Sequence, residues 1–102
     1  MTVTVRVYQK NGLCRGPGIG NAIFFAVVGW GGPSAGTSYP LAATGPSPLS
    51  GLEPVYTVPL PSQWLLDSFS PLWDLRVSSL NHESWQFPVG DGETHEVWLR
   101  PQ

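Results

Sequence analysis

The sequence has little ionic charge, and this scarcity excludes two classes of partner. Of its 102 residues, five are Lys or Arg and seven are Asp or Glu, so charged residues make up 12% and the formal net charge is −2. Nucleic-acid binding draws its affinity from clustered cations that release counterions from phosphates, and attachment to an anionic membrane surface also needs basic clusters. The few basic residues here are scattered, so we expect neither nucleic acid nor membrane among the partners.

Cysteine and long apolar runs are also scarce. The single cysteine, Cys14, cannot form an intramolecular disulfide, which argues against a secreted scaffold held together by disulfides. The first residues lack the basic start and apolar run of a signal peptide. A spanning helix needs about 20 apolar residues, and the most apolar stretch, 22–28, is far shorter. We therefore expect a protein made in a reducing cytoplasm, with no signal peptide or transmembrane segment.

Glycine and proline are abundant instead. The chain contains 12 glycines and 11 prolines, roughly twice their usual combined share of about 12%. Together with the low charge, this composition argues against a coiled coil, a helical bundle and a charged disordered tail. The hydrophobic fraction of 41% still supports a folded core, so we expect one domain that covers 1–102.

Alternating sequence patterns predict several short strands. In the segment 2–9, Val3, Val5 and Val7 fall on one face and mostly polar side chains on the other. A period of two with β-branched residues is typical of a half-buried strand. Further short strands are predicted at 55–58, 73–78, 84–87 and 94–100.

The segments between these strands complete the predicted fold. The apolar run 21–30 predicts a strand buried on both faces, with a short buried helix as the competing interpretation. Lys10-Asn11-Gly12 predicts a hairpin turn, and 16–20 predicts a structural turn because it lacks the spacing of a phosphate-binding loop. One short helix is predicted at about 62–69. The expected fold is all-β, a small antiparallel β-sandwich or barrel with this one helix.

The Gly/Pro-rich segment 31–54 is the most informative feature of the chain. It carries no charge between Gly31 and Leu52, and its prolines exclude a regular helix or a central strand. Loops of this length are uncommon in a compact domain unless they are functional or ordered against a partner. We therefore expect an extended interaction arm. Its expected contacts with partners are Trp30, Tyr39, Leu41, Leu49 and Tyr56.

The five tryptophans are many for a chain of this length. Large rings could fill a small core, they could contact a partner, since Trp and Tyr are enriched at interfaces, or they could stack on sugar rings. The low charge favours an interface over a sugar platform. The candidates for sugar stacking are Trp64, Trp73 and Trp85.

Two histidines and the cysteine are the candidates for chemistry. His82 and His95 are each followed by a glutamate, and imidazole and carboxylate ligands suit Zn or Fe. Neither pair has the spacing of two ligands on one strand face, so chance proximity explains them better. Cys14 with either histidine could form a nucleophile–base pair, but no local signature surrounds it. We expect no catalytic residue, no bound metal and no cofactor.

These observations favour a non-enzymatic structural assembly protein, such as a bacteriophage capsid decoration (cement) protein or tail accessory protein. A charge-poor surface suits contact with other proteins, and a proline-limited arm loses less entropy when it becomes ordered. The expected partners are other copies of the chain and capsid or tail proteins, in a virion assembled in the host cytoplasm. Two alternatives stay open: a carbohydrate-binding β-sandwich module, and a small metal- or cysteine-dependent enzyme.

Overall fold

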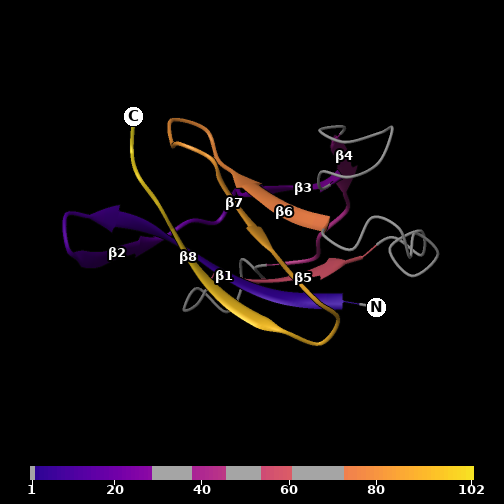
Figure 1. Cartoon of the computed structure of the whole chain (residues 1–102). Coiled ribbons are helices and arrows are strands. Elements are labelled where there is room, and N and C mark those ends of the chain that lie inside the picture. The colour runs from indigo at the N-terminus through magenta and orange to yellow at the C-terminus, as the bar shows by residue number, and fades with distance from the viewer. Residues whose placement is uncertain (1, 29–37, 46–53, 61–72) are drawn as a thin grey trace.

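The described part of the chain is built from strands. A computed structural model describes residues 2–28, 38–45, 54–60 and 73–102 (Figure 1). Two sheets share one buried core, which confirms the predicted all-β sandwich. The predicted helix at 62–69 lies outside the described residues. The strands are β1 (Thr2–Asn11), β2 (Cys14–Gly18), β3 (Ile23–Val28), β4 (Ser38–Leu41), β5 (Val55–Pro59), β6 (Trp73–Ser78), β7 (Trp85–Pro88) and β8 (Thr94–Leu99).

The first sheet is organised around β1. The first half of β1 pairs antiparallel with β5 and its second half pairs antiparallel with β2. Along its other edge β1 pairs with β8, and these two strands run parallel, with Val7 opposite Val97. The predicted antiparallel arrangement therefore holds for the described strand pairs except this one. A parallel pair needs a long crossover connection, and here the chain between β1 and β8 forms that connection.

The second sheet has the order β4-β3-β6-β7, with antiparallel neighbours throughout. Strand β4 lies within 31–54, where the sequence excluded a helix and a central strand, and it is an edge strand. Its Pro40 is tolerated because β4 is an edge strand, which pairs on one side only. Further on, Thr44 and Thr57 of β5 exchange two backbone hydrogen bonds of 2.9 Å. The described part of 31–54 therefore contacts both sheets.

The core lies between the sheets and follows the alternation of the sequence. Ile23 on β3 is nevertheless 55% exposed and Phe25 is half-buried. The prediction that β3 is buried on both faces is therefore wrong, because no further layer of described residues covers its outer face. The buried cluster takes Val3, Val5, Val7, Tyr56, Val58, Val97 and Leu99 from the first sheet and Phe24, Leu75 and Val77 from the second.

The hairpin formed by β1 and β2 extends beyond the body of the sandwich (Figure 1). Its two-residue turn is Gly12-Leu13, and only Gly12 has a positive φ, of 62°. The turn is thus one residue later than the predicted Asn-Gly turn, with glycine at the first central position as in type II′. Strand β2 takes up 16–18 of the turn predicted at 16–20, and the chain bends only at Gly20 and Asn21. A Cβ on Gly16 would lie 2.7 Å from the backbone oxygen of Gln9, so only glycine fits this close pairing.

Candidate binding surfaces

Tyr56, predicted to contact a partner, is instead part of the core. It is 2% exposed, and its ring centroid lies 5.0 Å from that of Phe24. Its hydroxyl donates to the backbone oxygen of Ile19 at 2.6 Å and accepts from the backbone N–H of Ala22 at 3.1 Å. Burial raises the pKa of this phenol above its usual value. The prediction is corrected: Tyr56 ties the connection between β2 and β3 to β5.

The other predicted interface residues have separate outcomes. Tyr39 lies on the edge strand β4 and is 43% exposed. Leu41, on the same strand, is half-buried and packs against the core. Trp30 and Leu49 lie outside the described residues. Of the two that the structure describes, Tyr39 is the more exposed.

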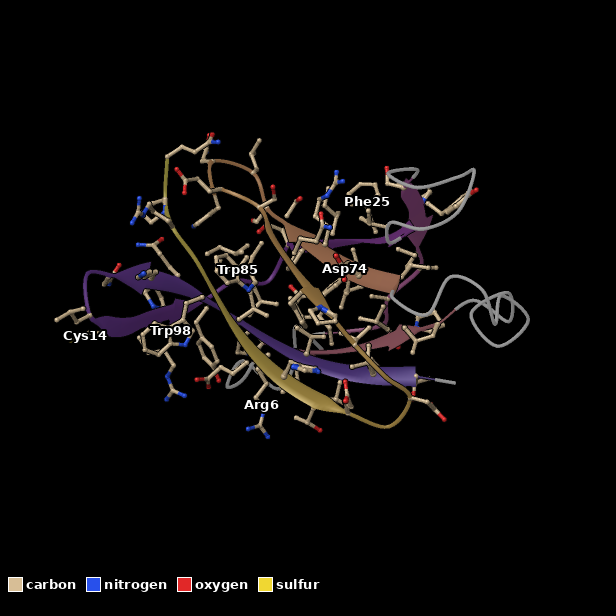
Figure 2. All side chains as sticks on the ribbon, in the orientation of Figure 1. Arg6, Cys14, Phe25, Asp74, Trp85 and Trp98 are labelled. Atoms are coloured by element: carbon tan, nitrogen blue, oxygen red, sulfur yellow. The ribbon has the colours of Figure 1, made fainter. Side chains whose placement is uncertain are left out.

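The tip of the β1–β2 hairpin is a surface that the sequence analysis missed. Leu13 is 96% exposed there, next to the exposed thiol of Cys14 (Figure 2). Arg15, on β2 opposite Lys10, holds the hairpin to the body. Its guanidinium lies 4.5 Å from the ring centroid of Tyr8 and 3.1 Å from a carboxylate oxygen of Glu96 on β8. The sequence did contain a signal for this surface, a leucine directly after Asn-Gly. A turn does not require an apolar residue, so the leucine indicates a contact.

A groove forms a second surface, where the ends of β1, β7 and β8 meet. It has a volume of about 240 Å³, and its apolar lining comes from Trp85, Trp98 and Leu99. Trp85 is 57% exposed. Of the three candidates for sugar stacking, Trp85 therefore borders a groove. Trp64 and the side chain of Trp73 lie outside what the structure describes.

Four polar side chains line the same groove, and the sequence analysis proposed none of them. They come from three separate parts of the chain: one from β1, two from the segment before β7, and one directly after β8. Nothing in their spacing indicates that they meet. They are Lys10, Glu83, Ser84 and Arg100.

The residues considered for metal or thiol chemistry bond to their own neighbours. The ring nitrogens of His82 lie 2.9 Å from the backbone oxygen of Leu80 and 3.3 Å from the side-chain oxygen of Gln9. Cys14 sits at the hairpin tip, and no hydrogen bond joins it to a histidine within the described ranges. In the same part of the chain, no group of three or more His, Cys, Asp or Glu side chains could hold a metal ion.

His95 is engaged at the turn that leads into β8. Its Nε2 lies 3.0 Å from Oε1 of Glu93, and its ring packs on Phe87 with centroids 4.9 Å apart. The same carboxylate oxygen accepts the backbone N–H of Gly90 at 2.6 Å. The hydrogen bond with His95, followed by that from Gly90, lowers the pKa of Glu93 below its usual value. This arrangement closes a turn.

Comparisons with protein-family models, curated proteins and solved structures give no match. Across the described ranges, no helix has the length and apolar character that crossing a membrane requires. The hairpin tip and the groove are therefore the two features from which function is inferred.

Proposed function

We propose that this protein is a non-enzymatic structural assembly protein that attaches to other proteins through the β1–β2 hairpin. A virion component, such as a capsid decoration or tail accessory protein, is the setting that fits best. The observation that carries the proposal is Leu13, 96% exposed at the tip of the projecting hairpin. Buried in a pocket of a neighbouring subunit, such a side chain contributes about 1.5–3 kcal/mol.

Two further features support attachment through this hairpin. The hairpin is held by the contacts of Arg15 with Tyr8 and Glu96, so less freedom is lost when the tip docks. Charged residues make up only 12% of the chain, and protein interfaces are depleted in charge at their centres. On a repeating lattice, many modest contacts of this kind add up to tight attachment.

The test measures association of the purified chain by sedimentation, together with its binding to capsids and tails of the virus that encodes it. Replacing Leu13 by Ser removes the apolar contact, and we expect association to weaken about tenfold or more. Leu80→Ser is the matched control, because Leu80 is also an exposed leucine, at 75%, but lies in the turn after β6.

Three results would contradict the proposal. The first is a wild-type chain that stays monomeric and does not sediment with either particle. The second is a Leu13→Ser variant that associates as strongly as the wild type. The third is an equal loss in the Leu80→Ser control, which would trace association to general surface hydrophobicity and not to the hairpin.

A further inference from the structure

The groove at Trp85 presents one aromatic ring to solvent. Trp85 is 57% exposed, and its indole N–H has no hydrogen-bond partner among the described residues. The N–H of Trp98, by contrast, donates to Glu96 Oε2 at 3.2 Å. Figure 2 shows the two labelled indoles on either side of the β8 ribbon. An indole offers an apolar face together with a polar edge, which suits the C–H face and the hydroxyls of a sugar ring.

Unpaired polar groups converge on the same groove. Within the described ranges, the side chains of Lys10, Glu83, Ser84 and Arg100 make no ion pair or hydrogen bond. They offer both donors and acceptors, which matches sugar hydroxyls that donate and accept. Two cations and one carboxylate line the groove, so it carries local positive charge in a chain whose net charge is −2. A ligand with a negative group is therefore favoured.

The backbone around the groove disfavours a peptide as its ligand. The N–H of Glu83 donates to the oxygen of Arg100 at 2.8 Å, and that of Gln102 donates to the oxygen of Asn81 at 2.9 Å. These bonds occupy main-chain groups that an added peptide strand would need. The volume of about 240 Å³ is also below the about 300–1,000 Å³ of common ligand pockets, so it suits a single ring of a longer ligand.

We propose that this groove binds a carboxylate-bearing saccharide, of the uronic or sialic acid class. The C–H face of one sugar ring stacks on Trp85. The carboxylate is held by Lys10 and Arg100, and ring hydroxyls bond to Glu83 and Ser84. The proposal uses Lys10 from the hairpin strand β1 but none of the tip residues, so it does not rest on Leu13.

The test titrates the full chain with saccharides while the indole N–H resonances are followed by NMR. The acidic probes are trigalacturonate and sialyllactose, the neutral ones maltotriose and lactose, and hexaglutamate is the peptide probe. We expect the acidic saccharides to shift the Trp85 resonance with a Kd of about 1 mM or below, and the neutral ones to bind about tenfold more weakly.

Two variants test the charged contact and the stacking contact separately. Arg100→Gln should abolish the preference for acidic over neutral saccharides, and because Arg100 is exposed this variant keeps the fold. Trp85→Ala should weaken binding of every saccharide about tenfold or more. The matched controls are Arg6→Gln, an exposed arginine on β1, and Ile23→Ala, whose side chain is 55% exposed. Both controls should bind like the wild type.

Several results overturn the proposal. Equal affinity for acidic and neutral saccharides would remove the role of the cations, and hexaglutamate binding as tightly as the acidic saccharides would assign the groove to an acidic peptide. Titrations that leave Trp85 unchanged would show that no sugar binds there. Leu13→Ser should leave saccharide binding intact, and Trp85→Ala should leave association intact, so each proposal can fail without the other.

Discussion

The two ends of strand β1 both pair with neighbouring strands, but their surroundings are opposite. In the body, β5 pairs with residues 2–6 of the strand on one side and β8 with residues 4–9 on the other, and Val3, Val5 and Val7 are at most 1% exposed. At its far end, Lys10 and Asn11 pair with β2 in the projecting hairpin and neither is buried. Hydrogen bonding therefore continues past the point where burial ends.

This difference separates the energetics of the two regions. The body is stabilised by apolar side chains that the second sheet covers, whereas an isolated two-stranded hairpin is at best marginally stable in water. The hairpin is held by the Arg15–Glu96 ion pair, whose side chains are 53% and 41% exposed, and such surface pairs contribute about 0–1 kcal/mol. Stability is thus expected to lie in the body, while the hairpin tip is free for contact.

The largest effect should come from the same substitution made once in each region. Leu75 is 0% exposed and Leu13 is 96% exposed. Leu75→Ala should lower the free energy of unfolding by about 2–5 kcal/mol, because it leaves a cavity in the core. Leu13→Ala should change it by less than about 0.5 kcal/mol. Urea denaturation measures both, and similar losses in the two variants would break the comparison.

A smaller effect is expected from removing one buried hydroxyl. Tyr56→Phe leaves the carbonyl of Ile19 and the N–H of Ala22 without their partner, at a cost of about 1–3 kcal/mol in unfolding free energy. Tyr8→Phe is the control at the base of the hairpin. It keeps the ring beneath Arg15, and its hydroxyl makes no hydrogen bond among the described residues. Equal stability of Tyr56→Phe and the wild type would show that this tie between β5 and the β2–β3 connection is dispensable.

The smallest effect concerns Glu93, in the turn that joins β7 to β8. The bonds from His95 and Gly90 lower the pKa of Glu93 below 4.5 in the folded chain. The stabilisation of the fold by these two bonds is therefore present above about pH 4.5, and it is lost as the pH falls through the folded pKa of Glu93. Glu93→Gln should lower Tm slightly at pH 7, and the difference from the wild type should shrink below pH 4.5. A difference that persists unchanged in acid would contradict this account.

The sequence predicted the strands whose pattern is local. Alternation at 2–9, 73–78 and 94–100 was enough to place β1, β6 and β8, because a half-buried strand shows its inner face every second residue. β2 and β4 were missed, since Gly and Pro obscure any alternation and only pairing with a neighbour makes these segments strands. Tyr56 was placed on the surface because a phenol suits both environments, and only the nearby groups of Ile19 and Ala22 make its burial favourable.

The candidate surfaces divide in the same way. From the sequence alone came the low charge, the abundance of tryptophan and the choice of Trp85 as a ring available for stacking. The tertiary structure alone decided that Trp85 shares a groove with Lys10 and Arg100 and that β1 pairs parallel with β8. Side-chain periodicity is set by neighbours along the chain, whereas a groove and a parallel pair depend on which distant segments come together. Which distant segments come together is decided by the arrangement that buries the core as a whole.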